Sequence, residues 1–127
     1  MMNLNQVTVP SSDIERSVFF YQELGLKLIV KSPHYARFVC PDGNSTFSVH
    51  LTDALPQGTG ISVYFECENL DATVEELRRK EIVFDALPTD QSWLWREAYL
   101  KDPDGNQLIL FFAGKNRLDP TWKIGKH

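Results

Sequence analysis

The sequence repeats one pattern of elements, and this repeat limits the possible folds more than any other feature. In each half, a segment that alternates apolar and polar residues is followed by an apolar stripe at positions i, i+4 and i+7, typical of one face of a helix. The stripes consist of Ile14, Val18 and Tyr21 in the first half and of Leu70, Val74 and Leu77, 56 residues later, in the second. A repeat of this length predicts two copies of one supersecondary unit.

The tetrapeptide Pro-Asp-Gly-Asn also occurs twice, at residues 41–44 and 103–106, each time between two strand-like segments. This sequence is a common signal for a turn that joins neighbouring antiparallel strands. The two turns lie 62 residues apart, so the second copy carries about six additional residues, which we assign to a loop over 88–96. Chance similarity of two unrelated segments is the alternative, but element order, helical phase and turn agree, which favours a true repeat.

The first copy is expected to hold one helix and four strands. Residues 4–9 form the first strand, and Ser12 with Glu15 has the spacing of a capping box that starts the helix. Gly25 ends this helix, because glycine adopts the left-handed conformation without steric cost. The remaining strands are expected over residues 26–31, 35–40 and 46–52.

The second copy follows the same order. Residues 61–67 form its first strand, and Asn69 is the expected helix cap. Further strands are expected over residues 82–87, 97–102 and 107–112. The sequence therefore predicts an α+β fold of two tandem βαβββ modules in one domain of residues 1–127. The modules span about 4–52 and 61–113, with a linker over about 53–60 and a C-terminal tail over 114–127.

Composition and charge narrow the classes of partner. Thirteen basic and seventeen acidic residues give a formal charge of −4 without a basic run, so we expect no nucleic-acid partner. No apolar run approaches the ~20 residues that span a bilayer, and the first ten residues lack the pattern of a signal peptide. We therefore expect a cytoplasmic protein without a membrane partner. Cys40 and Cys67 lie in separate strand-like segments, which predicts reduced thiols.

Three segments carry a resemblance to a known family: LNQVTVPSSDIERSVFFYQELGLKL, ISVYFECENLDATVEELRRK and WLWREAYLKDPDGNQLIL. Over residues 4 to about 113 the chain resembles the vicinal oxygen chelate superfamily, which includes glyoxalases and bleomycin-resistance proteins. The resemblance implies that the two modules form a curved mixed sheet around a central cleft, with the helices outside. It also implies a homodimer, as in many members, and the sequence leaves open whether two subunits exchange modules.

Metal-dependent members of this family hold one divalent ion with ligands on the first and last strands of each module. By position, the resemblance carries these roles to Gln6 and, near the end of the fourth strand, to His50. Ser62 and Ile109 stand where a histidine and a carboxylate are expected, so two ligands are missing. Glu66 shares the strand parity of Ser62 and is the best candidate for a replacement. Because a catalytic site usually has three protein ligands, we expect no cofactor; a divalent metal held by Gln6, His50 and Glu66 is the alternative.

A cleft without a metal suits a small organic ligand. Trp93, Trp95 and Tyr99 lie in or beside the longer loop of the second module, where they could stack on a planar molecule. Arg96 could clamp a carboxylate or a phosphate. The structural alternative is that the aromatic residues cover the core or a dimer interface and that Arg96 pairs with a neighbouring acid such as Glu97. The candidate ligand-binding residues are Gln6, His50, Ser62, Tyr64, Trp93, Trp95, Arg96 and Ile109.

Signals for covalent catalysis are weak. The chain lacks a G-x-S-x-G sequence, and neither cysteine has a histidine partner in a recognisable motif. Acid–base chemistry by His50 with Glu66 stays open. The leading hypothesis is a metal-free, dimeric binding protein for a small, partly aromatic or anionic molecule, not a metal-dependent enzyme. The alternatives are a divalent-metal-dependent lyase, isomerase or thiol transferase of the glyoxalase type, and a structural or regulatory dimer without a ligand.

Overall fold

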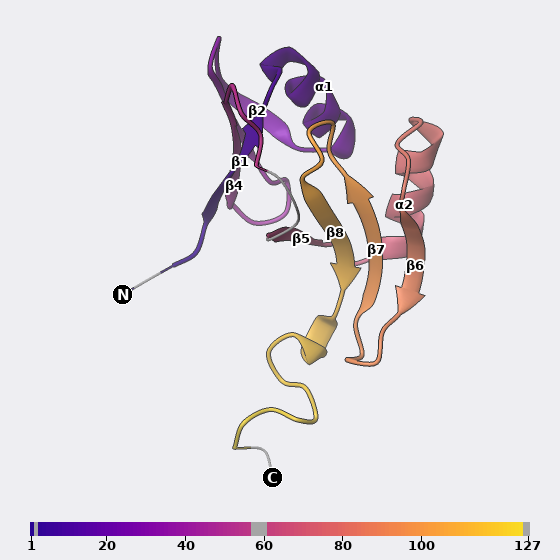
Figure 1. The fold of residues 1–127 in the computed structure, drawn as a ribbon. Coiled ribbons are helices and arrows are strands. Elements are labelled where there is room, and N and C mark those ends of the chain that lie inside the picture. Colours follow the sequence, from indigo (N-terminus) through magenta and orange to yellow (C-terminus); the bar gives the residue numbers. More distant parts are fainter. Residues whose placement is uncertain (2, 57–60, 126–127) are drawn as a thin grey trace. The chain divides into compact units, whose positions relative to one another are not determined.

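The computed structural model describes residues 1, 3–56 and 61–125 (Figure 1). The chain forms two compact units. Unit 1 comprises residues 1–60 together with the short segment 102–106, and unit 2 comprises residues 61–101 and 107–127. Each unit contains one βαβββ module, which confirms the predicted α+β fold class. The second half of the expected linker, residues 57–60, lies outside the described residues.

Unit 1 is a four-stranded mixed sheet with one helix. Its elements are β1 (Gln6–Ser11), α1 (Ile14–Leu24), β2 (Lys27–Ser32), β3 (Tyr35–Val39) and β4 (Thr46–Leu51). The strand order is β1-β4-β3-β2, with β1 parallel to β4 and the other pairs antiparallel. Helix α1 packs against β2, β3 and β4.

The core of unit 1 lies between α1 and the sheet. The predicted stripe of Ile14, Val18 and Tyr21 is buried, which confirms the helical phase. The Tyr21 ring contacts Phe38 on β3 and Phe47 on β4, with ring centroids 5.7 and 4.7 Å apart. Since successive strand residues point to opposite faces, these contacts identify which residues of each strand face the helix.

The two ends of α1 test the predicted boundaries. Gly25 has a φ of 110° and its N–H bonds to the carbonyl of Gln22, so the predicted C-terminal glycine is confirmed. The predicted capping box at Ser12 is wrong: Asp13 is the N-cap, and its side chain accepts a 3.1 Å hydrogen bond from the backbone N–H of Arg16. The Ser12 hydroxyl instead bonds to Asp104, a partner 92 positions away that local spacing does not reveal.

Unit 2 repeats this arrangement. Its elements are β5 (Ser62–Glu66), α2 (Leu70–Arg79), β6 (Ala86–Asp90), β7 (Arg96–Lys101), β8 (Gln107–Phe112) and a short 3₁₀ turn, η1 (Gly114–Asn116). The strand order is β5-β8-β7-β6, with β5 parallel to β8 and the other pairs antiparallel. The predicted stripe of Leu70, Val74 and Leu77 is buried, and the Asn69 side chain accepts from the N–H of Ala72, as expected of the cap.

The strand predicted near 82–87 exists, but its predicted start is wrong, because β6 begins only at Ala86. The preceding residues end the helix: the backbone N–H of Ile82 bonds to the carbonyl of Leu77, and Glu81 has a left-handed φ of 67°. Strand β6 then continues through Pro88, which the sequence assigned to the loop. Proline is tolerated there because β6 is an edge strand and its pairing with β7 is irregular around this residue.

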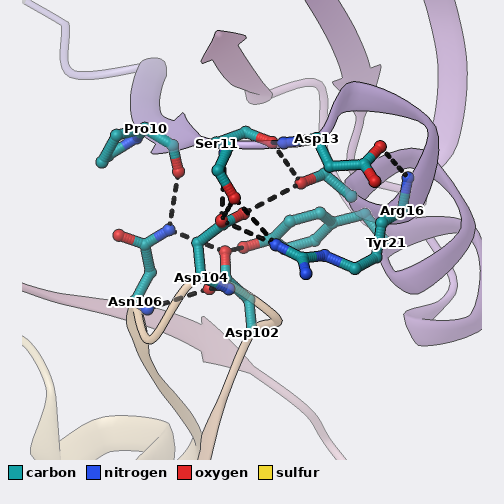
Figure 2. Close-up of polar contacts among 10 residues, drawn as sticks. Pro10, Ser11, Asp13, Arg16, Tyr21, Asp102, Asp104 and Asn106 are labelled. Carbon is teal, nitrogen blue, oxygen red and sulfur yellow. Dashed lines mark hydrogen bonds and ion pairs between the residues drawn. The ribbon is translucent and has the colours of Figure 1, made fainter. Parts of the chain in front are cut away.

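The second Pro-Asp-Gly-Asn turn joins β7 to β8, yet its contacts lie within unit 1 (Figure 2). Asp102 accepts a hydrogen bond from Tyr21, and the Asn106 side chain donates to the carbonyl of Pro10 over 3.0 Å. Asp104 forms a 2.9 Å ion pair with Arg16. The turn is therefore held by β1 and α1 through its own side chains.

Among the described residues, no helix has the length and apolar character needed to cross a membrane.

Candidate functional site

Each sheet has one face that packs on its own helix and one that is turned away from it. In unit 1, Phe38 and Phe47 contact Tyr21 of α1, so Arg37 and Ser48 lie on the opposite side, here called the α1-distal face. In unit 2, Arg96 contacts the α2 residue Asp71, so its strand neighbour Glu97 lies on the α2-distal face. The candidate residues lie on the α1-distal face, on the α2-distal face or, for Arg96, on the α2 side.

The α1-distal face is polar. Its side chains come from β1, β3 and β4 and are Gln6, Thr8, Tyr35, Arg37, Thr46, Ser48 and His50. The Gln6 amide donates a 2.8 Å hydrogen bond to the buried hydroxyl of Ser48 and accepts one from Thr46. The Tyr35 hydroxyl lies 2.6 Å from the same Ser48 oxygen, and the Tyr35 ring contacts His50 edge-on. Hydrogen bonds connect all of these side chains except His50, which adds only its ring contact with Tyr35.

Gln6 and His50 lie on the same face but apart along the strands. Gln6 pairs with Thr46, whereas His50, four residues further on β4, pairs with Pro10. At about 3.3 Å per strand residue, this offset corresponds to roughly 13 Å. A single ion requires ligand atoms within about 2–2.6 Å of its centre, so this spacing does not suit a shared ion.

The α2-distal face is aromatic. The Trp95 ring stacks on Phe111 with centroids 4.7 Å apart and an interplanar angle of 17°. The Tyr64 ring approaches both of them edge-on, at 6.0 Å from Trp95 and 5.6 Å from Phe111. Tyr64 is 48% exposed, whereas Phe111 is buried and packs with Ile109. We call Tyr64, Trp93, Trp95, Tyr99, Ile109 and Phe111 the aromatic cluster.

Glu97 lies inside the aromatic cluster and was not among the predicted site residues. It is only 2% exposed, and its two carboxylate oxygens accept hydrogen bonds from Trp93 Nε1 (2.9 Å) and from the Tyr99 hydroxyl (2.6 Å). The hydrogen bond to Glu97, with burial and the carboxylate charge, raises the pKa of Tyr99 to about 12. The alternation of side chains along β7 is the sequence signal that identifies Glu97, because it places this residue on the same face as Tyr99.

Ser62 and Ile109 both lie on the α2-distal face, in neighbouring rows of the β5–β8 pair. Ser62 is exposed and pairs with Gln107, whereas Ile109 is 4% exposed and pairs with Tyr64. An exposed hydroxyl and a buried alkyl group supply neither the imidazole nor the carboxylate of a usual divalent-metal site.

The Glu66 carboxylate is already used by the chain. One oxygen accepts from the backbone N–H groups of Ala113 (2.9 Å) and Gly114 (3.1 Å), and the other lies 3.6 Å from Arg117 Nε. Glu66 therefore fixes the start of η1. Over residues 1, 3–56 and 61–125, no three His, Cys, Asp or Glu side chains are grouped to hold a metal ion. The donor set does not fit the metal site that the family implies.

Arg96 lies on the α2 side of the sheet, away from the aromatic cluster. Its Nε and Nη2 atoms contact both oxygens of Asp71 at 2.9 and 3.2 Å, and Nη1 contacts Asp90 at 3.0 Å. Arg96 therefore pairs with acids, as in the structural alternative, but its partners are Asp71 and Asp90 and not the neighbouring Glu97. Hydrogen bonding to Arg96 lowers the pKa of Asp71.

The cysteines lie at strand ends. Cys40 is a half-buried free thiol at the end of β3, and burial raises its pKa, so it is a weak nucleophile at neutral pH. Cys67 is half-buried after β5.

Comparison with known proteins identifies one family. The sequence model of the Glyoxalase/Bleomycin resistance protein/Dioxygenase superfamily matches residues 3–110. A glyoxalase/bleomycin resistance protein/dioxygenase from Nocardioides is 24% identical, with a TM-score of 0.75 over 89% of this chain and 84% of that chain.

Two structures whose names refer to bleomycin share the fold. A bleomycin resistance determinant encoded on the transposon Tn5 is 20% identical, with a TM-score of 0.75 over 87% of this chain and 98% of that chain. A bleomycin-binding protein complexed with bleomycin is 20% identical, with a TM-score of 0.74 over 88% and 98%, respectively.

Proposed function

Because the chain belongs to the Glyoxalase/Bleomycin resistance protein/Dioxygenase superfamily, we propose that it binds a small organic molecule with a flat apolar part, without requiring a metal ion. The aromatic cluster on the α2-distal face is the observation that carries this proposal. Tyr64 and Trp93 are 48% and 43% exposed although they belong to a cluster with a buried base. Large aromatic side chains that stay exposed together are typical of ligand-binding surfaces.

The two tryptophan rings of the cluster are held in fixed positions, which favours binding over a loosely packed surface. Trp95 Nε1 donates to the carbonyl of Asn116 over 3.1 Å, and its ring lies flat on Phe111. Trp93 Nε1 donates to the buried Glu97 carboxylate. A ligand that stacks on such rings pays little ordering entropy, because the rings are already ordered.

The related proteins support a binding role. One structure of this fold is a bleomycin-binding protein in complex with bleomycin, which supports small-molecule binding by this fold. The rival function, metal-dependent catalysis, requires ligands that Ser62 and Ile109 do not offer and a Glu66 carboxylate that already accepts two N–H bonds. A ligand-binding protein needs none of these groups. The homodimer and the cytoplasmic location expected from the sequence remain predictions.

Tryptophan fluorescence tests the proposal. The chain has three tryptophans, and Trp122 lies exposed in the C-terminal tail, so the variant Trp122→Phe leaves emission from Trp93 and Trp95 alone. In this background we expect at least one compound of a panel of flat aromatic molecules to quench the emission saturably. Treatment with a chelator should leave that affinity unchanged.

Substitutions in the cluster identify the binding surface. Tyr64→Ala removes an exposed ring and should weaken binding about tenfold, equivalent to about 1.4 kcal/mol. The matched control is Leu118→Ala, which removes an exposed apolar side chain outside the cluster and should leave the affinity unchanged. Absence of quenching by every compound, or equal loss in both variants, would refute the proposal.

A further inference from the structure

Arg37 differs from every other arginine of the chain. The sequence contains six arginines, all within the described residues, and five of them form ion pairs with Asp or Glu. These five are Arg16, Arg78, Arg79, Arg96 and Arg117. Arg37 has no carboxylate within ion-pair distance among the described residues. It is therefore a positive charge that the fold leaves uncompensated, in a chain of formal charge −4.

The side chain of Arg37 is nevertheless held in one orientation. Its Nε donates a 2.9 Å hydrogen bond to the Tyr35 hydroxyl, and its guanidinium carbon lies 5.4 Å from the centre of the Tyr35 ring. The Tyr35 hydroxyl is fixed in turn by the buried Ser48 oxygen at 2.6 Å, to which Gln6 also donates. Ordering the flexible side chain of an exposed arginine costs conformational entropy. Hydrogen bonds that hold such a side chain in one orientation therefore favour a binding role.

This orientation leaves the Nη1 and Nη2 atoms of Arg37 without a bond to the rest of the described chain. Two parallel N–H groups on one edge of a guanidinium match the two oxygens of a carboxylate or of a phosphate. Arg37 stands directly opposite Ser48 in the β3–β4 pair, and Tyr35 stands opposite His50. A cation, a phenol and an exposed imidazole are thus neighbours on the α1-distal face.

We propose that Arg37, with Tyr35 and His50 beside it, forms a subsite for the oxyanion group, carboxylate or phosphate, of a small ligand. The inference rests on unit 1 alone and does not depend on the aromatic cluster of unit 2. Burial alone would raise the pKa of Tyr35, but the hydrogen bond with Ser48, the hydrogen bond from Arg37 and the charge of Arg37 together lower it. An oxyanion bound at Arg37 would reduce this effect.

Nuclear magnetic resonance of the arginine Nε–H groups tests the subsite in the full chain. Three probes are titrated separately: benzoate, its neutral analogue benzamide, and inorganic phosphate. We expect benzoate, phosphate or both to shift the Arg37 Nε–H and the backbone signals of β3 and β4, and benzamide to shift neither. A response to benzoate alone identifies a carboxylate subsite, and a response to phosphate alone a phosphate subsite.

Two variants separate the subsite from general charge attraction. Arg37→Gln should weaken binding of the responding anion at least tenfold, whereas Arg79→Gln, which removes an exposed arginine of α2, should leave it unchanged. Arg37→Lys keeps the charge but loses the paired N–H groups, so its affinity should fall between those of wild type and Arg37→Gln. Thermal unfolding confirms that each variant is folded.

The subsite is refuted if neither anion shifts Arg37, if benzamide acts like benzoate, or if Arg37→Gln and Arg79→Gln weaken binding equally. The proposed function is judged separately by quenching in the Trp122→Phe background. Quenching by neutral aromatic compounds with no anion response at Arg37 would leave the proposed function intact and overturn only the subsite.

Discussion

The Tyr21 hydroxyl donates a 2.6 Å hydrogen bond to Oδ2 of Asp102, a residue 81 positions further along the chain, and both side chains are buried. The other Asp102 oxygen accepts the backbone N–H groups of Asp104 and Asn106, each over 2.9 Å. One carboxylate thus shapes the 102–106 turn and ties it to α1. The corresponding positions of the first turn and second helix are Cys40 and Leu77, which cannot form this bond.

We expect Tyr21→Phe to destabilise the protein by about 2 kcal/mol, because it removes a hydrogen bond to a buried charged group while keeping the ring. Urea unfolding followed by circular dichroism measures the loss. The matched control is Tyr64→Phe, which removes the hydroxyl of a half-exposed ring and should change stability by less than about 0.5 kcal/mol. Equal stability of Tyr21→Phe and wild type would show that the contact contributes nothing.

The lowered pKa of Asp104 predicts that the free energy of unfolding decreases in acid. Burial alone would raise its pKa, but the hydrogen bonds from Ser12, the charge of Arg16 and the hydroxyl of Ser17 together lower it. A carboxyl group with a lower pKa in the folded state contributes stability above its unfolded pKa, near 4, and loses that contribution as the pH falls through the folded pKa. Stability should therefore decrease below about pH 4.

Asp104→Asn should be less stable than wild type near neutral pH and should lose less stability on acidification, as measured by urea unfolding at each pH. Asp71→Asn is the matched control. Its pKa is also lowered, by Arg96, but this carboxylate is exposed and solvent screens the pair, so its effect on the acid limb should be smaller. Parallel pH profiles for wild type and Asp104→Asn would contradict the assignment.

The helices were predictable because their signals are local. An apolar stripe, an Asn cap and a terminal glycine each act within a few residues, so spacing alone placed α2 and the end of α1 correctly. The start of α1 was misassigned because the partner of Ser12 is Asp104, 92 positions away. The start of β6 was misassigned because the first apolar residues of the segment 82–87 belong to the turn that ends α2, in which Glu81 has a left-handed φ.

The candidate site was only partly predictable for a similar reason. The tryptophans stand out by residue type. Residue type also suggests Arg96 as a ligand-binding side chain and Glu97 only as its ion-pair partner, but adjacent residues of a strand point to opposite faces. Arg96 therefore pairs with Asp71 on the α2 side, whereas Glu97 lies inside the aromatic cluster. The sequence alone does not single out Arg37, because an arginine in an ordinary strand carries no motif. Its importance follows from what it does not contact, and such information exists only in three dimensions.

The tyrosines on the two distal faces should titrate in separate steps. The hydrogen bond to Glu97 raises the pKa of Tyr99 to about 12, whereas Ser48 and Arg37 lower that of Tyr35 although burial opposes them. Ultraviolet absorbance at alkaline pH should show one phenol ionising below its usual value near 10 and one near 12. Tyr35→Phe should abolish the early step, and Glu97→Gln should move the late step toward 10. A single step for all phenols would contradict both assignments.

The protein should bind no divalent metal ion tightly. Dialysed protein should contain well under one equivalent of Ni, Zn, Mn, Fe or Co by elemental mass spectrometry, and calorimetry should detect no tight site. The reason lies in the donors: the Gln6 amide is engaged by Thr46 and Ser48, and the Glu66 carboxylate accepts the N–H groups of Ala113 and Gly114. Ser62 and Ile109 offer no imidazole or carboxylate to replace them.

Single substitutions test whether a metal ion, if one binds, is held by the candidate ligands. Gln6→Ala, His50→Ala and Glu66→Gln each remove one candidate ligand, while His34→Ala, in the exposed turn between β2 and β3, is the matched control for His50. If one equivalent of a divalent metal binds tightly and any of the first three variants abolishes it while His34→Ala does not, the chain is a metalloprotein and the metal-free binding role is wrong. Because Glu66 fixes η1, the Glu66→Gln result requires a parallel unfolding curve of the metal-free protein. Without metal, loss of a ligand alone leaves the midpoint unchanged, whereas loss of a structural contact lowers it.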